Sequence, residues 1–363
     1  MNFSPAVLQR RVTYTALLSL ALAAGPLALA QEPAAAGKLE QPAVAKPAAK
    51  AAAKAAQAKP AAQAANNPIV PYKITPTAKD LPYGTHPRQV LDFWQAKSTT
   101  PTPVVFFIHG GGWNNGDKSS AVRTLDLPKL LDSGISVVTI NYRLVPQAYD
   151  AGIEPPVKWP LSDAARALQF VRSKATEWNL DKARIGACGG SAGACSSLWL
   201  AMHDDMATPD SKDPIEREST RLWCAVVSGA QTSLDPAETS AWIPNMEYGG
   251  HAYGFREAGQ ARPAEFKKFL AGREKVLPWL KEYSPASHAS KDDPTIVLFY
   301  GQKEPAQKGD TQKDPTHSIL LGKLLKEKLD PLGVKCVVTS PGEPDPSFTS
   351  ITDSLITELK AAK

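Results

Sequence analysis

Six short runs of β-branched and aromatic residues alternate with longer polar or amphipathic segments, and this alternation limits the fold more than any other feature of the sequence. The pattern is typical of parallel strands that are joined by crossover helices. We therefore expect a doubly wound α/β domain over residues 68–363. The predicted strands lie at 103–110, 135–143, 183–190, 222–230, 295–301 and 334–340. Apolar residues at helical spacing predict helices at 161–178 and 316–333 and, more weakly, at 216–223.

One connection between predicted strands is too long to be a simple crossover. Residues 235–290 are rich in aromatic residues, among them Trp242, Tyr248, Tyr253, Phe255 and Trp279. Doubly wound sheets bind their ligands at the carboxyl ends of the strands. We expect this insertion to lie over those ends as a cap or a long loop. For most of its aromatic side chains we favour a packing role over a place in a pocket wall.

The first 67 residues differ in composition from the predicted domain. Arg10 and Arg11 precede an apolar run that ends in an Ala-Leu-Ala motif at Ala30, which predicts an export signal peptide over residues 1–30. A Gly-Pro pair inside this short run argues against an uncleaved membrane anchor. Residues 31–67 consist mainly of Ala, Lys, Pro and Gln, which predicts a disordered tether. We expect an exported protein, periplasmic or secreted, with no transmembrane anchor after cleavage.

The distribution of charge argues against a nucleic-acid-binding protein. Residues 1–67 contain seven Lys or Arg and two Glu, against totals of 41 Lys or Arg and 36 Asp or Glu, so the predicted domain has equal numbers of each sign. A neutral domain offers no basic footprint for phosphates. The lysines of the tether could contact polyanions such as cell-wall polymers, although we favour a solvated spacer.

A G-x-S-x-G motif follows the strand predicted at 183–190 and precedes a helix-like run. In this motif the serine lies on a strand-to-helix turn so tight that its flanking positions must be glycine, here Gly189 and Gly193. The N-terminus of the following helix favours negative charge nearby. The motif alone is not specific, but the flanking strand and helix fit it, and we expect Ser191 to be a nucleophile.

A second glycine-rich turn, beginning with His109, follows the strand predicted at 103–110. A tetrahedral oxyanion needs several backbone N–H groups that point at one place, and consecutive glycines allow this. We predict an oxyanion hole formed by Gly111, Gly112 and Ala192, and a scaffolding role for His109. The competing interpretation is a phosphate-binding loop, but the sequence contains neither G-x-x-x-x-G-K-[ST] nor G-x-G-x-x-G.

The cysteines and histidines do not predict a cofactor or a metal site. No Cys/His spacing resembles that of a zinc or iron site. An exported chain could form disulfides, but most of the cysteines lie in apolar strand-like runs, so buried thiols are at least as compatible with the pattern. The four are Cys188, Cys195, Cys224 and Cys336.

At its two glycine-rich motifs the chain resembles the α/β-hydrolase-fold carboxylesterases, in particular the exported bacterial branch near the hormone-sensitive-lipase-like and feruloyl-esterase-like enzymes that carry H-G-G-G-W. The resemblance also includes residues 81–94, 141–144 and 177–194, and it covers the chain from about residue 80 onward. It implies an α/β-hydrolase fold with a mostly parallel sheet. It also implies hydrolysis of carboxylic esters through an acyl-serine, with short acyl groups or carbohydrate esters as substrates.

The order of catalytic residues in that family implies an acid after the strand predicted at 295–301 and a histidine farther on. Glu304 has the expected spacing, and we favour it as the acid that would hold an imidazolium. Asp310 and Asp314 remain alternatives, because both precede the predicted helix and a short insertion could have shifted the role to either.

The histidine itself is absent from the place where the family has it. Pro341 and Gly342 match the family pattern after the last strand, but Asp345 occupies the histidine position, and no histidine follows His317. An aspartate, whose unperturbed pKa lies about 2.6 units below that of imidazole, is a poor base at neutral pH.

Three explanations remain open. The base could have moved to His317 or His251, although a histidine at a helix start, such as His317, is more often a surface cap. The esterase could be slow or altered. The chain could also be a catalytically silent pseudoenzyme that binds an acyl or carbohydrate ligand. We favour the first two, because Ser191 and the oxyanion loop are intact. An imidazole within hydrogen-bond reach of Ser191 would discriminate between enzyme and binding protein.

Overall fold

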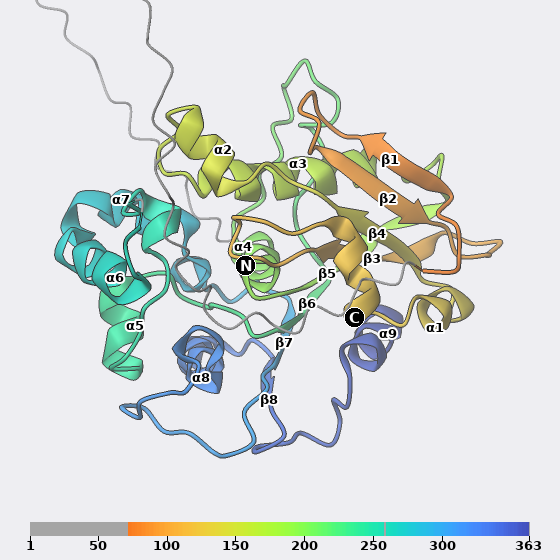
Figure 1. Cartoon of the computed structure of the whole chain (residues 1–363). Helices are drawn as coiled ribbons and strands as arrows, with labels where there is room; N and C mark the ends of the chain where they lie inside the picture. Colours follow the sequence, from red (N-terminus) through yellow and green to blue (C-terminus); the bar gives the residue numbers. More distant parts are fainter. Residues whose placement is uncertain (1–71, 258, 363) are drawn as a thin grey trace, which may run out of the picture. The chain divides into compact units, whose positions relative to one another are not determined.

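A computed structural model describes residues 72–257 and 259–362, which all belong to one compact unit. Within it an eight-stranded sheet has the order β1-β2-β4-β3-β5-β6-β7-β8 (Figure 1). β1 pairs antiparallel with β2 and β2 antiparallel with β4, whereas all other neighbours are parallel. The predicted α/β architecture is therefore confirmed. The strands are β1 (Ala78–Pro82), β2 (Val90–Trp94), β3 (Thr102–Ile108), β4 (Ser136–Ile140), β5 (Leu180–Gly190), β6 (Cys224–Ser228), β7 (Thr295–Phe299) and β8 (Cys336–Thr339).

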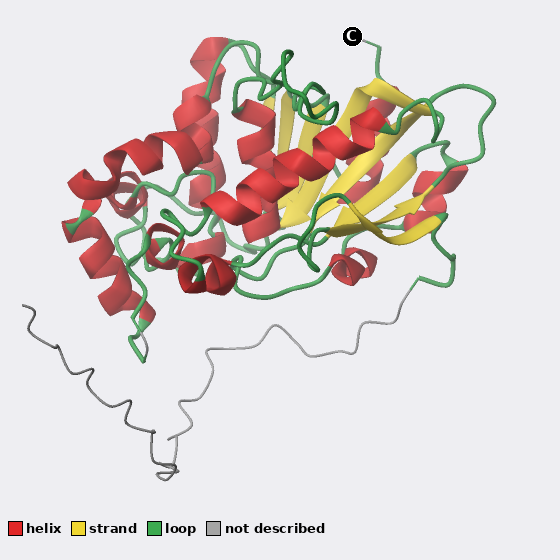
Figure 2. Cartoon of the chain, turned by 90° about the horizontal axis from the view of Figure 1, so that it is seen from above, coloured by secondary structure: helices red, strands yellow, loops and turns green. Residues whose placement is uncertain are grey.

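Helices cover both faces of this sheet (Figure 2). The α-helices are α1 (Leu127–Asp132), α2 (Val145–Asp150), α3 (Lys158–Ser173), α4 (Ala192–Met202), α5 (Pro236–Trp242), α6 (Arg262–Ala271), α7 (Leu277–Tyr283), α8 (Ile319–Leu329) and α9 (Ile351–Lys360). The 3-10 helices are η1 (Lys118–Arg123), η2 (Gly250–Tyr253), η3 (Arg273–Val276), η4 (Pro285–His288), η5 (Pro315–His317) and η6 (Asp330–Leu332).

The side chains of β3 show how the two faces are buried. Successive side chains of a strand point to opposite faces. Phe106 and Ile108 belong to a large core that includes residues of α3, α4 and α8. Val105 and Phe107 belong to a second core that includes residues of α1 and α9. β3 is therefore a central strand, apolar on both faces, and its carboxyl end opens directly into the glycine-rich turn.

The segment 216–223, for which a weak helix was predicted, contains no helix. Side chains from outside the segment bind its backbone instead. Asp205 Oδ1 accepts the N–H of Thr220 at 2.9 Å, and the guanidinium of Arg172 donates to the carbonyl of Arg221. Its Ser and Thr residues compete for backbone groups in the same way, which disfavours a helix.

The expected signal peptide (1–30) and tether (31–67) lie outside the described residues, as do the first four positions of the expected domain. Among the residues that the structure does describe, no helix is both long and apolar enough to cross a bilayer. All four cysteines are buried and remain thiols.

The insertion at 235–290 folds into a cap of short helices, α5, η2, α6, η3, α7 and η4. Its aromatic side chains serve packing, as expected: Tyr248 and Tyr253 are buried in the larger core, and Trp242, Phe255 and Trp279 pack against it. The cap lies at the carboxyl end of β3, because His251 Nε2 is 2.9 Å from the carbonyl oxygen of Gly112.

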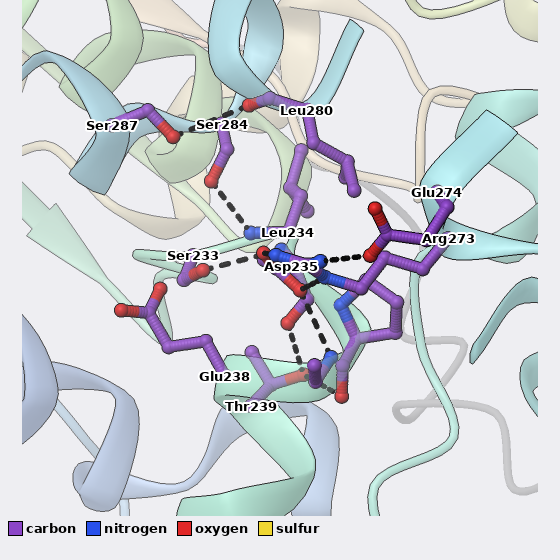
Figure 3. Close-up of polar contacts among 12 residues, drawn as sticks. Ser233, Leu234, Asp235, Glu238, Thr239, Arg273, Glu274, Leu280, Ser284 and Ser287 are labelled. Atoms are coloured by element: carbon purple, nitrogen blue, oxygen red, sulfur yellow. Dashed lines mark hydrogen bonds and ion pairs between the residues drawn. The ribbon is translucent and has the colours of Figure 1, made fainter. Parts of the chain in front are cut away.

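One ion pair ties the start of the cap to its middle (Figure 3). Arg273 donates to both carboxylate oxygens of Asp235, at 2.7 and 2.6 Å. The same carboxylate caps α5 by accepting the N–H of Ala237 at 2.9 Å. Burial alone would raise the pKa of Asp235, but these hydrogen bonds outweigh it and hold the pKa below its usual value.

We expect Asp235→Ala to lower the free energy of unfolding by about 1–3 kcal/mol, because both the helix cap and the partner of Arg273 are lost. Asp235→Asn keeps an acceptor for the Ala237 N–H and should lose less. Urea denaturation at pH 7 measures both differences. Because the folded pKa is lowered, the contribution of Asp235 is present above its unfolded pKa near 3.9 and disappears as the pH falls through the folded value. Identical unfolding midpoints for the three proteins would contradict the prediction.

Candidate active site

Ser191 lies at the turn between β5 and α4 in a backbone conformation that L-residues rarely adopt, with φ 53° and ψ −122°. Two flanking glycines make the turn possible. A Cβ atom at Gly189 or Gly193 would lie 2.3 or 2.1 Å from the carbonyl oxygen of Ile108. The end of β3 therefore presses against the turn, and the strained serine is held in place by this close approach.

The glycine-rich turn after β3 lies beside this serine. A Cβ at Gly110 would be 2.5 Å from the carbonyl oxygen of Gly190 and 3.5 Å from Ser191 Cβ. Gly111 and Gly112 have φ values of 105° and 60°, which glycine adopts without strain. Ala192 is the first residue of α4, where a backbone N–H has no acceptor within the helix. The three predicted oxyanion-hole residues thus lie on two adjoining turns.

His109 is buried behind this turn. Its ring stacks on Tyr142 with centroids 4.1 Å apart, and its Nδ1 lies 2.8 Å from the carbonyl oxygen of Gly110. Burial lowers the pKa of His109 to about 4, so the ring is neutral at neutral pH. A neutral ring can donate from Nδ1 and accept at Nε2 from Arg88 Nη2, which is 3.3 Å away. These contacts match the scaffolding role predicted from the sequence.

The imidazole of His317 lies next to Ser191. Its Nε2 lies 2.9 Å from Ser191 Oγ, which is within the reach that proton transfer requires. His317 is the last residue of η5, in the loop between β7 and α8. A histidine at a helix start is more often a surface cap, but here Asp314 caps η5 and His317 faces Ser191.

Asp314 completes the arrangement. Its Oδ2 lies 2.8 Å from His317 Nδ1, and its Oδ1 accepts the backbone N–H of His317 at 3.3 Å. The carboxylate thus caps η5 and orients the ring at once. Glu304, the acid that we favoured, is exposed, and no hydrogen bond among the described residues joins it to His317. Asp310, the other alternative, accepts the N–H of Gln307. The carboxylate that the structure pairs with His317 is therefore that of Asp314, one of the two alternatives, and not that of Glu304.

Three neighbouring residues hold His317 and the loop that carries it. A Cβ at Gly229 would lie 3.3 Å from Cδ2 of His317, so the glycine at the end of β6 makes room for the imidazole. The amide of Gln231 donates to the carbonyls of Gly229 and Thr316, at 3.2 and 2.8 Å. Gln302 donates to the carbonyl of His317 at 3.3 Å. The loop that carries the imidazole is thereby joined to β6 and to its own start after β7.

The loop after β8, where the resemblance placed the histidine, is tied down elsewhere. Asp345 accepts the N–H of Ser347 at 2.9 Å, and its own N–H donates to Thr339 Oγ1. Glu343 pairs with Lys323 on α8 at 2.7 Å. Asp345 thus serves its own turn and is not a substitute base in this geometry.

The remaining histidines have other partners. His251 contacts the carbonyl of Gly112, and His288 contacts the carbonyl of Glu282 at 2.7 Å. The ring of His203 packs at a tilt against that of His288, with centroids 4.4 Å apart, and His86 Nδ1 accepts the N–H of Arg88. Among the described histidines, only His317 forms a hydrogen bond with Ser191.

The sequence did hold a signal for this pair. Asp314 and His317 are three residues apart at the start of a helical segment, a spacing that allows an Asp to cap the turn and to meet the histidine side chain. The two side chains are also accessible, with 60% and 39% of their surfaces exposed.

A family model and several known esterases are similar in sequence to this chain. A model of the BD-FAE family matches residues 91–314. The chain is 29% identical over 235 residues to the "Probable carboxylic ester hydrolase LipM" and 30% identical over 235 residues to "Esterase LipC", both of Mycobacterium tuberculosis. These matches cover 62% and 61% of this chain and 47% and 50% of the relatives. The chain thus spans about half the length of the curated relatives it matches.

Solved structures with a similar backbone include a "Truncated form of carbohydrate esterase from gut microbiota", with a TM-score of 0.56 and 19% identity over 80% of this chain and 99% of that one. Another is an "acetyl ester-xyloside bifunctional hydrolase from Caldicellulosiruptor lactoaceticus", with a TM-score of 0.50 and 22% identity over 70% and 78% of the two chains. At these identities the likeness shows the fold alone, which is the α/β-hydrolase fold that the resemblance implied.

We expect Gly193→Ala to destabilise the protein by about 2 kcal/mol or more, because the new Cβ would overlap the Ile108 carbonyl across the turn. Gly301→Ala is a matched control. Gly301 is exposed, and a Cβ there meets no atom within 4 Å. Thermal unfolding of the two variants beside the wild type tests this. Equal midpoints for both variants would mean that β3 does not press on the turn as described.

Proposed function

The chain belongs to the BD-FAE family, and on that premise we propose that it hydrolyses carboxylic esters with Ser191 as nucleophile, His317 as base and Asp314 as acid. The observation that carries the proposal is the 2.9 Å contact between His317 Nε2 and Ser191 Oγ. A silenced binding protein would not need an imidazole at this distance. We therefore place the pseudoenzyme interpretation second.

From these contacts we infer the following course for ester hydrolysis. His317 Nε2 takes the proton of Ser191 Oγ as the oxygen attacks the ester carbonyl, and the negative charge on the carbonyl oxygen turns toward the N–H groups of Gly111, Gly112 and Ala192. Asp314 stabilises the imidazolium from Nδ1. The imidazolium then gives its proton to the departing alcohol, which leaves an acyl-serine. A water molecule that is deprotonated by His317 hydrolyses this intermediate and restores the enzyme.

Because Asp314 is exposed to solvent, it should stabilise the imidazolium less than a buried acid would. Solvent weakens the attraction between Asp314 and an imidazolium, because most of the carboxylate surface is in contact with water. Asp314 therefore acts mainly by holding the ring in the right orientation and tautomer. Its removal should cost less than the loss of about 10⁴ in kcat that follows removal of a buried triad acid.

For the substrate we propose short acyl esters, including acetyl groups on carbohydrates. The support is that two solved structures of similar fold are a carbohydrate esterase and an acetyl ester-xyloside bifunctional hydrolase. A mixture of small acyl-xylo-oligosaccharides and aryl acetates would separate preference for the sugar from preference for the acyl group.

We expect His317→Ala to lower kcat for p-nitrophenyl acetate by about 10³–10⁴, and Asp314→Asn by about 10–10². Ser191→Ala should reduce the rate to background. Glu304→Gln is the matched control, an acid of the same loop, and should stay within about twofold of the wild type. A large loss in Glu304→Gln together with a small one in Asp314→Asn would return the acid to position 304.

A fluorophosphonate probe tests the nucleophile independently of the ester chosen. It should label the wild type at Ser191 and label His317→Ala at least about 10² times more slowly, because the serine then has no base. If the wild type and Ser191→Ala were labelled equally, the proposed esterase activity would be wrong, whatever the substrate.

We also propose that residues 1–30 direct export and are removed after Ala30, so that the mature chain begins at Gln31 with the 31–67 tether. The support is the Arg-Arg pair, the short apolar run and the Ala-Leu-Ala motif. N-terminal sequencing of the exported protein would find Gln31. A retained apolar run would mean an anchor instead.

A further inference from the structure

One stretch of the cap, residues 245–251, contacts both loops that serve Ser191. At its first residue, the side-chain amide of Asn245 forms a pair of hydrogen bonds with the backbone of Gln312. Asn245 Nδ2 donates to the Gln312 carbonyl at 2.8 Å, and the Gln312 N–H donates to Asn245 Oδ1 at 2.9 Å. Gln312 is two residues before Asp314, so this pair holds the backbone that leads into the acid.

A second contact supports the same loop from the cap. The N–H of Gly309 donates to the carbonyl of Trp242 at 2.9 Å, and Lys308 Nζ lies 4.6 Å from the centre of the Trp242 ring. Asn245 is thus the side-chain part of a short cross-link between the end of α5 and residues 308–312.

At the other end of the stretch, His251 contacts the oxyanion loop. Its Nε2 donates to the carbonyl of Gly112 at 2.9 Å. The residue is buried and fixed on its far side, since Glu265 Oε1 accepts its backbone N–H at 2.6 Å and lies 3.7 Å from Nδ1. A donor on the Gly112 carbonyl restricts rotation of the peptide groups on either side of it.

We propose that Asn245 and His251 are positioning residues, through which the cap sets the acid–base loop and the oxyanion loop on the two sides of Ser191. Neither residue touches the reacting atoms. The inference rests on the proposed function, because positioning matters only if Ser191 is a nucleophile.

The acid–base loop needs such a contact. Between β7 and η5 the chain forms neither helix nor strand, and most of residues 301–314 are exposed. Fixing a backbone residue costs about 1–2 kcal/mol of conformational entropy, so an exposed loop stays ordered only where hydrogen bonds offset that cost. The hydrogen bonds that Gln302 and Gln231 make hold the His317 end, and Asn245 holds the approach to Asp314.

Tyr248 provides a contrast within the same stretch. It is buried, and its hydroxyl has no hydrogen-bond partner among the residues that the structure describes, although it would lie 3.8 Å from a Cβ at Gly112. The hydroxyl therefore makes no polar contact with the oxyanion loop, and Tyr248→Phe is a matched control for His251→Phe.

The first test is hydrogen exchange, which needs no activity. In Asn245→Ala the amides of residues 309–314 should exchange about tenfold faster, because the Gln312 N–H loses its acceptor. In Asn245→Asp, which keeps that acceptor, the increase should be smaller. Glu238→Gln is the control, because it breaks the Glu238–Lys328 ion pair between α5 and α8, at 2.6 Å, without touching either loop. Unchanged exchange in Asn245→Ala would overturn the proposal.

The second test is kinetic. We expect Asn245→Ala to lower kcat for p-nitrophenyl acetate about tenfold, and His251→Phe about 10–10², with KM unchanged and both variants still folded at the assay temperature. Glu238→Gln and Tyr248→Phe should match the wild type. Because the two residues hold different loops, their effects should multiply in the double variant.

The outcomes separate the two proposals. If the wild type is no more active than Ser191→Ala, the proposed function fails, and exchange alone decides whether Asn245 holds the loop. If the wild type is active and exchange in Asn245→Ala rises while kcat does not fall, the loop is held but not positioned for catalysis, and the inference is wrong. A loss that follows the unfolding midpoint in all four single variants would also overturn it, because it would show a general effect of cap stability.

Discussion

The contact between the end of β3 and the turn after β5 is the constraint on which the site depends. Gly189 and Gly193 allow the Ile108 carbonyl to approach within a distance that any Cβ would block. That approach holds Ser191 at a positive φ and brings the Gly110 turn beside it. The proposed nucleophile and the proposed oxyanion loop thus lie at the ends of two neighbouring parallel strands, and the sheet itself sets their relative positions.

The proposed acid and base are placed by a different principle. Asp314 and His317 lie on one turn of 3-10 helix, so a single loop delivers both. In the family that the chain resembles, they come from two loops that follow successive strands. The local arrangement makes the Asp–His distance a property of one turn, because Asp314 caps the same turn that it orients. It also frees the loop after β8, in which Glu343 and Asp345 serve structural contacts.

The sequence was sufficient for the parts of the site that steric rules dictate. A strand, a tight turn and a helix require glycine at fixed places, so the fold, the turn that carries Ser191 and the glycine-rich turn beside it could be predicted from residue types. The proposed acid could not be predicted in this way. Its expected spacing from β7 favoured Glu304, and only the path of residues 305–313 decides which carboxylate reaches His317. His317 was undervalued because its start-of-helix position suggests a cap, and in the structure Asp314 is the cap. The helix predicted at 216–223 failed for a related reason, since side chains from elsewhere took its backbone groups.

An acid–base pair on an exposed loop is held less by packing and more by hydrogen bonds and other specific contacts. Packing fixes an acid–base pair in a buried loop. Here the side chains of Asp314 and His317 are 60% and 39% exposed, so fewer neighbours hold them. The restraint then has to come from specific contacts: Gly229 at the ring, Gln231 and Gln302 at the backbone of the loop, and the cap at Gln312. Each such hydrogen bond contributes only about 0.5–1.5 kcal/mol, so no single one fixes the loop, but several together can. Moving the base onto this loop therefore makes the geometry of the site depend on the cap as well as on the sheet.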